Sequence, residues 1–459
     1  MREKQLNAQQ NQATKLAPPE AGWMEHINQI YSGRWVNPQT GKTAPHCGVR
    51  TIEIAESLEG REAELVRTAA LEGGTALVAD ENTWDAAGNR IARNLKKEGI
   101  ALTEVILKGR PKANLPAVEA LGKQLEGFQS VIAVGSGTVN DLVKYVTAQD
   151  QRDYCVFGTA ASMDGYTSTT ASISLPSGLK KSLPAQIPRG VFLDIGVIAS
   201  APSFLAAAGY GDCMCNSVAR IDWWMSHRLL GTYFSLEPYL IAETEKDAFQ
   251  EIAPGIAAGD VVAVGYLVRS LVLSGIGVAF TGSSHHGSMG EHQISHYIDC
   301  FAGQRHPGSL HGEQVGVASL SMSRIQQWFL DQSTPPLLKP TKIDPDDMAR
   351  RMGPDIADQC IQEYRAKALD ETGAEQMNQR LAEIWTELKT ECLEIVEATE
   401  AMTQSLGLAG GATTAAELGV PVDFYREAVR HGHEMRNRFS FADLACDAGL
   451  LDEFAAAEG

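Results

Sequence analysis

The sequence lacks two features that would indicate a nucleic-acid-binding or a disulfide-linked protein, namely an excess of basic residues and a regular cysteine framework. Its 459 residues carry 39 Lys and Arg against 57 Asp and Glu, a formal net charge of −18. Nucleic acids and anionic membranes attract basic surfaces, so we expect neither as a partner. The eight cysteines are scattered without a CxxC pair, which is typical of reduced thiols in a cytoplasmic enzyme.

The N-terminus lacks the apolar segment of a signal peptide. Residues 1–22 are polar and predict a disordered lead-in. The most apolar run begins at Val261, but it carries Arg269 near its centre and three glycines. We therefore expect a buried core helix there and no membrane span.

Residues 23–199 show the alternation of strands and helices that is typical of an α/β domain. Apolar runs of strand type occur at 75–80, 101–107 and 131–134, and each precedes a segment of helical periodicity. The third run leads through the turn Gly135-Ser136-Gly137-Thr138-Val139 into a helix expected near Asn140. Free amides at a helix N-terminus favour a phosphate group, although glycine turns of this kind also occur without a ligand.

Two carboxylates follow predicted strands of this domain. Asp80 ends the first run, where a dinucleotide fold holds a ribose hydroxyl; the alternative is a turn or helix-cap role. Asp164 lies in a loop of small hydroxyl residues after the strand that begins near Tyr154. Open parallel sheets bind ligands at the carboxyl ends of their strands, so both residues are candidates for ligand binding. A further strand is expected over 191–199.

Histidines are concentrated in the second half of the chain, where helical patterns replace strands. Six of the eleven lie between Gly282 and Gly312. His292 and His296 are four residues apart, which places both imidazoles on one face of a helix and predicts a metal or proton-transfer site. His285, His286 and His306, taken singly, are equally compatible with surface or core positions. Residues 200–459 are therefore predicted to form a helical domain, with a charged helical addition over 334–401.

Five motifs in order carry a resemblance to a known family: GSGTVNDLVKY, TAASMDGYTS, AAGYGDCMCN, GEHQISHY and LHGEQVGV. The chain resembles the bacterial sn-glycerol-1-phosphate dehydrogenases, which group with glycerol dehydrogenase, the iron-containing alcohol dehydrogenases and dehydroquinate synthase. The resemblance implies an α/β N-terminal Rossmann-like domain and an all-α C-terminal metal-binding domain, with the active site in the interdomain cleft.

The resemblance also implies roles for individual residues. The pyrophosphate would be held by Gly135, Ser136, Gly137, Thr138 and Val139, and the rest of the dinucleotide site would be lined by Thr159, Ala160, Ala161, Ser162 and Ser168. Asp164 would contact substrate, and Asp212 would bind both metal and substrate, although a Gly-Asp step is otherwise most often a helix N-cap. His292 and His311 would complete the metal site and His296 would face the substrate, whereas spacing alone favours His292 and His296 as the chelating pair.

The implied activity is a metal-dependent, NAD(P)-linked interconversion of dihydroxyacetone phosphate and sn-glycerol 1-phosphate. The cofactors would be NAD or NADP and one divalent ion, zinc, nickel or iron. Asp80 favours NAD, because its charge repels a 2′-phosphate. A cytoplasmic homo-oligomer acting on a phosphorylated triose or polyol is expected.

At one place the chain departs from the SSRP motif expected of these relatives, because it has Ser284-His285-His286-Gly287 instead. If that arginine holds substrate phosphate, other donors must replace it, and the candidates are His285, His286, Arg305, Lys180 and Lys181. Three alternatives follow. They are a dehydrogenase of an unphosphorylated polyol such as glycerol, a cyclising lyase like dehydroquinate synthase, and a non-catalytic relative that uses residues 334–401 as an interaction surface.

Overall fold

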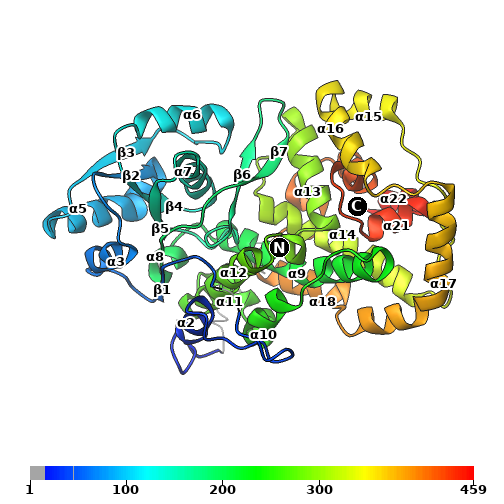
Figure 1. Cartoon of the computed structure of the whole chain (residues 1–459), viewed down its shortest axis with the longest axis horizontal. Coiled ribbons are helices and arrows are strands. Elements are labelled where there is room, and N and C mark those ends of the chain that lie inside the picture. Colours follow the sequence, from blue (N-terminus) through cyan, green and yellow to red (C-terminus); the bar gives the residue numbers. More distant parts are fainter. Residues whose placement is uncertain (1–15, 45) are drawn as a thin grey trace, which may run out of the picture. The chain divides into compact units, whose positions relative to one another are not determined.

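The computed structural model describes residues 16–44 and 46–459 (Figure 1). Its contacts divide the chain into two compact units. The first comprises the described residues up to Cys213, Leu236–Ser283 and Leu408–Gly410; the second comprises Met214–Ser235, Ser284–Gly407 and Gly411–Gly459. Of the lead-in predicted over 1–22, residues 1–15 lie outside the described part of the chain.

The first unit contains a six-stranded parallel sheet in the order β1-β8-β5-β4-β2-β3. Its strands are β1 (Thr51–Ala55), β2 (Thr75–Asp80), β3 (Leu102–Leu107), β4 (Ser130–Gly135), β5 (Asp153–Gly158) and β8 (Gly190–Asp194). β4 and β8 are buried along their whole length, as expected of parallel strands covered on both faces. The three apolar runs at 75–80, 101–107 and 131–134 are thereby confirmed as strands.

The chain reverses its direction across the sheet between β2 and β4. β3 pairs with one side of β2, and the chain then crosses back to place β4 on the other side. From β4 it proceeds through β5 to β8 in one direction. Such a reversal is a topological switch point, where diverging loops leave a crevice for a ligand. Asp80 ends β2 and the Gly135 turn follows β4, so both predicted cofactor groups lie at this point.

Helices cover the sheet. On one face, α3 (Glu62–Ala69), η1 (Trp84–Gly88) and α5 (Asn89–Lys97) contribute to one apolar cluster with the strands.

Near α6 (Leu115–Gln124), α7 (Gly137–Gln149) begins three residues before the expected Asn140. The amide of Asn140 already donates to the carbonyl of Ser136 at 2.9 Å, so the first turn of α7 is helical. Apolar periodicity does not mark that turn.

Two expectations for the end of the α/β region need correction. The strand predicted over 191–199 ends at Asp194, whose side chain accepts a hydrogen bond from the amide of Val197 at 3.1 Å and caps the short helix α8 (Ile195–Ala199). An antiparallel hairpin of β6 (Thr170–Ser174) and β7 (Lys180–Pro184) is not predicted, because its strands are short and largely polar.

The most apolar helix, α12 (Val261–Thr281), belongs to the first unit. By length and composition alone it is apolar enough to cross a membrane, but 78% of its most apolar window is buried inside the protein. Its Arg269 pairs with Glu245 of α10 (Glu237–Glu251) at 2.8 Å. The prediction of a buried core helix is confirmed.

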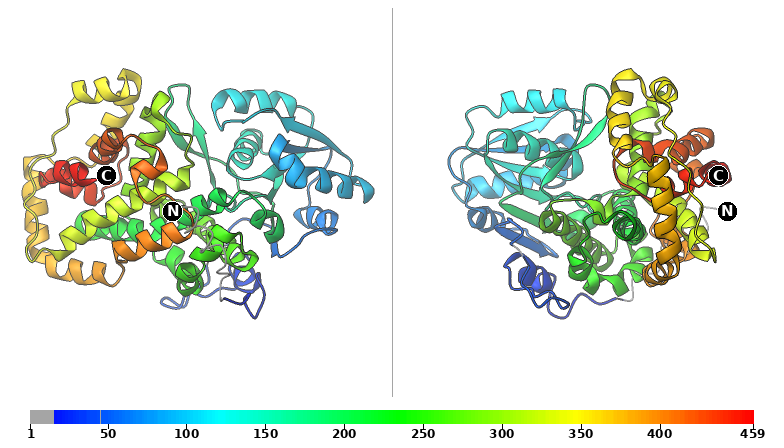
Figure 2. Two further views of the ribbon diagram at one scale, coloured as in Figure 1. Left: turned by 180° about the vertical axis from the view of Figure 1, so that it is seen from behind. Right: turned by 45° about the vertical axis from the view of Figure 1, so that its right-hand side comes forward.

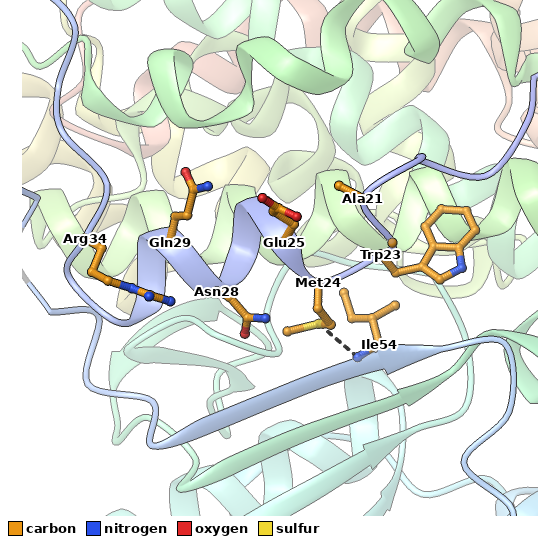
Figure 3. A pocket seen from close by; sticks show the side chains of 9 residues that line it. Ala21, Trp23, Met24, Glu25, Asn28, Gln29, Arg34 and Ile54 are labelled. Atoms are coloured by element: carbon orange, nitrogen blue, oxygen red, sulfur yellow. Dashed lines mark hydrogen bonds between the residues drawn. The ribbon is translucent and has the colours of Figure 1, made fainter.

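The segment before β1 packs against α12 and β1. Gly265 leaves room for the Trp23 ring, because a Cβ there would lie 2.4 Å from Trp23 Cη2. α2 (Glu25–Tyr31) follows, and the amide of Ile54 in β1 donates to Met24 Sδ at 3.1 Å (Figure 3). An open pocket of about 590 Å³ is lined by this segment and β1, and none of the predicted site residues lines it.

The second unit is helical (Figures 1 and 2). After the continuation of α9 (Ser203–Leu230), its α-helices are α13 (Gly290–Phe301), α14 (His311–Asp331), α15 (Pro345–Met352), α16 (Pro354–Arg365), α17 (Glu371–Leu393), α18 (Thr399–Leu408), α19 (Ala415–Leu418), α20 (Val422–His431), α21 (Phe441–Asp447) and α22 (Leu451–Ala457). The charged region around α17 is fixed to α9, because Trp224 donates to Glu391 at 3.0 Å and Arg228 pairs with Glu387 at 3.2 Å.

The segment 424–449 has helical periodicity throughout but does not form one continuous helix. α20 ends at His431, the 3-10 turn η4 (Gly432–Met435) follows, and α21 begins at Phe441. The break coincides with a close approach to α13, because a Cβ on Gly432 would lie 2.9 Å from the amide nitrogen of Ile294.

We expect Gly432→Ala to destabilise the protein by about 1–3 kcal/mol, because the backbone of α13 would have to move. Gly407→Ala is the matched control. Its Cβ would meet Thr413 Cγ2 at 3.6 Å, an ordinary contact, so a small stabilisation of about 0.4–1 kcal/mol is expected. Thermal unfolding of the two variants checks this, and equal midpoints would contradict it.

Candidate active site

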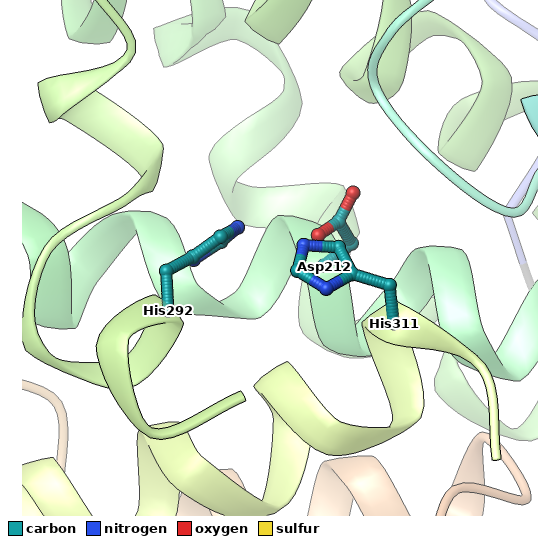
Figure 4. Close-up of side chains that lie close together, drawn as sticks. All are labelled: Asp212, His292 and His311. Carbon is teal, nitrogen blue, oxygen red and sulfur yellow. The ribbon is translucent and has the colours of Figure 1, made fainter. Parts of the chain in front are cut away.

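Three potential metal ligands converge from three helices. Asp212 of α9, His292 of α13 and His311 at the start of α14 each offer a ligand atom, and these atoms lie within 4.8 Å of one another (Figure 4). Asp212 and His292 are buried, whereas His311 is partly exposed. Two imidazoles with one carboxylate suit a divalent transition metal and leave coordination positions open.

Asp212 lies inside α9 rather than at its beginning. The helix starts at Ser203, so the N-cap alternative for Asp212 is wrong. α9 continues without a break past Met214, where the second unit begins. The carboxylate is thus carried on the same helix that enters the unit containing both histidines.

His296 lies close to the other two rings but outside the ligand groups. Its ring centroid is 6.1 Å from that of His292 and 5.6 Å from that of His311. The centroids of His292 and His311 are closer, at 4.9 Å. Among the described residues, both groups of potential metal ligands contain His292 and neither contains His296. The structure therefore brings together the set implied by the resemblance rather than the pair favoured by spacing.

Buried neighbours orient both imidazoles. Glu291 Oε1 lies 2.9 Å from His292 Nδ1 and also accepts the amide of Met289 at 2.7 Å. Ser295 Oγ lies 3.0 Å from His311 Nδ1 and donates to Gln314 at 2.9 Å. Partners on Nδ1 leave Nε2 to face a metal, as is usual for metal-binding histidines. Glu291 is not among the residues predicted from the sequence, although it stands next to His292 in GEHQISHY.

A second group of potential ligands shares His292. Cys215 and Glu291 have ligand atoms within 4.8 Å of one another and of His292. The Cys215 thiol donates to the carbonyl of Gly287 at 3.3 Å, and Glu291 already accepts two hydrogen bonds. The group with Asp212 and His311 offers two imidazoles and one carboxylate, a donor set that suits a divalent transition metal, so we take it as the candidate metal site.

Asp222 fixes the start of the histidine-bearing helix. Its fully buried carboxylate accepts hydrogen bonds from the amides of Gly290 and Phe441, at 3.1 and 3.0 Å, and from Gln326 at 3.0 Å. Burial, and then the charge of Glu291, raise the pKa of Asp222 to about 7. One carboxylate therefore joins α13, α14 and α21 at the point where α13 begins.

The two glycines of the Gly135 turn have different surroundings. A Cβ on Gly135 would lie 2.6 Å from Val139 Cβ, whereas one on Gly137 would meet only Met163 Cγ at 3.6 Å. No side chain caps the first turn of α7. Ser136 Oγ lies 3.2 Å from Ser162 Oγ, which brings the turn together with the segment from Thr159 to Ser162.

Asp80 takes the cap position that the sequence left open. Its Oδ1 accepts the amide of Thr83 at 2.8 Å, and the Thr83 hydroxyl accepts the amide of Asp80 at 3.0 Å, which forms a capping box. The carboxylate also lies at the switch point, so a cap role and a ligand role are compatible.

A buried lysine that no sequence motif marks organises the loop around Asp164. Lys144 of α7 is fully buried and donates to Ser168 Oγ at 3.1 Å and to the carbonyls of Gly165, Ser168 and Thr170. Burial lowers the pKa of Lys144 to about 8. Ser168 Oγ is therefore engaged within the protein. Asp164 accepts a hydrogen bond from Ser274 of α12 at 2.9 Å.

The candidate phosphate donors named from the sequence have different environments in the structure. The Arg305 guanidinium lies 3.9 Å from the centroid of the Phe424 ring. Lys180 and Lys181 belong to β7 in the first unit. The pKa of His285 is lowered to about 3, by burial and then by Arg438 and Arg436, so this imidazole is neutral.

Comparisons with known proteins identify the family. The model of the family described as iron-containing alcohol dehydrogenase matches residues 53–202. A protein of Thermococcus kodakarensis named glycerol-1-phosphate dehydrogenase, with NAD(P)+ in the name, is 30% identical over 278 residues, which cover 60% of this chain and 77% of the relative. A protein of Methanosarcina mazei with the same name is 30% identical over 60% of this chain and 75% of its own length. The chain belongs to the glycerol-1-phosphate dehydrogenase family.

Longer alignments within the family agree with this result. The Geobacillus thermodenitrificans protein of that name is 28% identical over 82% of this chain and 87% of its own. For this family NAD(P) and a metal are the expected cofactors.

Solved structures confirm the predicted fold class. Glycerol dehydrogenase from Schizosaccharomyces pombe superimposes with a TM-score of 0.59 at 19% identity, covering 89% of this chain and 90% of that one. A probable glycerol dehydrogenase from Sinorhizobium meliloti gives 0.58 at 18% identity, with 89% and 98% covered. At this identity the likeness concerns the fold alone.

Replacing Glu291 by glutamine should lower metal affinity by about 10- to 100-fold, because the His292 ring would lose its charged acceptor. Metal retained against a graded chelator, measured on protein loaded with zinc, checks this. Glu453→Gln on the exposed side of α22 is the control. Retention equal to the wild type would show that Glu291 does not support the site.

Proposed function

We propose that this chain catalyses the reversible, NAD(P)-linked interconversion of dihydroxyacetone phosphate and sn-glycerol 1-phosphate with a divalent metal. The convergence of Asp212, His292 and His311 carries the proposal, because these are the side chains that could bind such an ion in a relative of glycerol-1-phosphate dehydrogenases. A bound divalent metal would supply Lewis acidity toward a substrate oxygen.

Residues around the three ligands orient the imidazole rings, and one of them, His296, is assigned to carry a proton. Glu291 and Ser295 hold the two imidazoles in one orientation. His296, whose centroid lies 5.6 Å from that of His311, is assigned to hold or deliver the proton at the substrate oxygen. Asp164, kept in place by Ser274, is assigned to contact the substrate hydroxyl groups.

The dinucleotide is assigned to the switch point of the sheet. Its pyrophosphate would accept hydrogen bonds from the first-turn amides of α7 and gain from the positive end of the helix dipole. The segment of Thr159, Ala160, Ala161 and Ser162 borders this turn, and Ser168 would act through the loop that Lys144 holds. The nicotinamide supplies the hydride. Asp80 would hold the ribose.

The remaining expectations stay predictions. They are the domain bounds 23–199 and 200–459, the homo-oligomeric state, the cytoplasmic location, and the choice among zinc, nickel and iron.

Protein stripped of metal and reconstituted with zinc or nickel should oxidise NADH with dihydroxyacetone phosphate and much less with dihydroxyacetone. His311→Ala should abolish this metal-dependent turnover, because it removes a ligand. His227→Ala, which alters a histidine of α9 outside the ligand group, is the control. If His311→Ala keeps both turnover and metal content, the ligand assignment fails; a preference for the bare ketone would favour a polyol dehydrogenase.

Asp80→Asn tests the assignment of the ribose. Asparagine is an equally good N-cap, so the fold of α4 (Glu81–Thr83) should be kept while the charge that repels a 2′-phosphate is lost. We expect the ratio of kcat/KM for NADH over NADPH to fall by about tenfold, equivalent to about 1.4 kcal/mol. An unchanged ratio at unchanged thermal stability would limit Asp80 to the cap role.

A further inference from the structure

Two arginines converge on the loop that leads into the histidine-bearing helix. Arg436 and Arg438 lie in the connection between η4 and α21. Arg438 donates to Ser284 Oγ at 3.1 Å and to the carbonyl of Ser288, and Arg436 donates to Ser288 Oγ at 3.3 Å. Ser288 is four residues before His292, so both guanidinium groups lie beside the chain that enters the metal-binding helix.

These two positive charges have no carboxylate partner. Among the described residues, no Asp or Glu oxygen lies within the ion-pairing distance of 4.0 Å of either guanidinium group. Their hydrogen bonds go to neutral serine oxygens. Placing two unpaired like charges together in a protein is unfavourable unless an anion compensates them. Each of the two residues keeps part of its surface exposed, although burial is the largest influence on the pKa of both guanidinium groups and lowers it.

The loop itself supplies no negative charge. His285 is neutral, because burial and the two arginines lower its pKa to about 3. Its ring lies against Trp223, with centroids 5.6 Å apart. Burial, and then the charge of Arg436, lower the pKa of Arg438 to about 9, although the more distant carboxylates of Glu291 and Glu363 act in the opposite direction.

Arg438 is also held rigidly relative to α13. Its carbonyl accepts hydrogen bonds from Gln293, the residue after His292, at 3.0 Å and from Lys367 at 2.9 Å. Asp222 joins the first residue of α13 to the first residue of α21, a short distance along the chain. The guanidinium groups therefore keep a fixed position with respect to His292.

We propose that Arg436 and Arg438, with the loop Ser284–Ser288, bind the phosphate group of the substrate. Paired guanidinium groups recognise phosphate through charge-assisted hydrogen bonds. The inference rests on the proposed function and deepens it, because it names the residues that distinguish a phosphorylated ketone from a bare one. It also assigns a role to the departure at His285-His286, since the cations come from a different segment of the same unit.

The test compares dihydroxyacetone phosphate with dihydroxyacetone on zinc-loaded protein. Arg436→Gln should raise the KM for the phosphorylated ketone about 10- to 100-fold, the loss expected for a hydrogen bond to a charged group. Turnover of the bare ketone and metal content should not change. Arg430→Gln, an exposed arginine of α20 paired with Asp452, is the matched control and should leave both substrates unaffected.

A purely structural role predicts a different pattern. If the arginines only brace the loop, Arg436→Gln would impair both ketones equally or lower metal content, and the proposal would be overturned. The variant Arg436→Lys further distinguishes phosphate binding from a structural role. It keeps the charge but not the planar fork, so an intermediate KM for the phosphorylated ketone is expected. If the glutamine variant does not fold, the lysine variant alone decides.

Calorimetric titration with inorganic phosphate separates this inference from the proposed function. Binding to the wild type that is lost in Arg436→Gln supports the phosphate site, even if neither ketone is reduced and the proposed function fails. If the wild type reduces dihydroxyacetone phosphate but the arginine variants keep both KM and phosphate binding, the proposed function stands and the phosphate site is refuted.

Discussion

The contact between Glu291 and His292 is the interaction on which the candidate metal site depends. A fully buried carboxylate is costly unless hydrogen bonds satisfy it, and in Glu291 one oxygen, Oε1, contacts both the ring of His292 and the amide of Met289, while Oε2 has no hydrogen-bond partner among the described residues. The same contact fixes the ring that all described ligand groups share. The buried carboxylate of Asp222 accepts hydrogen bonds from α13, α14 and α21 and so connects the three helices. The position of one imidazole thus follows from two buried acids, which explains why this part of the unit is so polar inside.

The first unit also contains a buried charged group that hydrogen bonds stabilise, but this group is positively charged. Lys144 is buried beneath the loop that carries Asp164, and its ammonium group is satisfied by four acceptors of that loop. Because the donors are on a helix that starts at the Gly135 turn, the turn and the loop are positioned by one element. In both units, therefore, a buried charge keeps irregular backbone in a defined shape next to regular structure.

Much of the fold can be predicted from the sequence, because β2, β4 and β8 are continuous apolar runs and the helices of the second unit have clear periodicity. The candidate ligands could be named only through their motifs, since spacing pairs His292 with His296, whereas packing at the start of α14 places His311 closer. The roles of Asp222, Lys144 and Arg436 depend on partners far away in the chain, and nothing local in the sequence marks them, whereas Glu291 lies next to His292. The break after α20 has no local mark in the sequence either, because it coincides with the close approach of Gly432 to α13.

The arrangement at the N-terminal segment has a consequence for association between molecules. β1 is an outer strand of the sheet, and an uncovered outer strand offers its free amides to a strand of another chain. Here the amide of Ile54 is already taken by Met24, and α2 lies alongside. Trp23, seated at Gly265, anchors that cover to the interior. Loss of this segment would therefore expose a template for aggregation through intermolecular β-sheet, even though none of the proposed ligands would be touched.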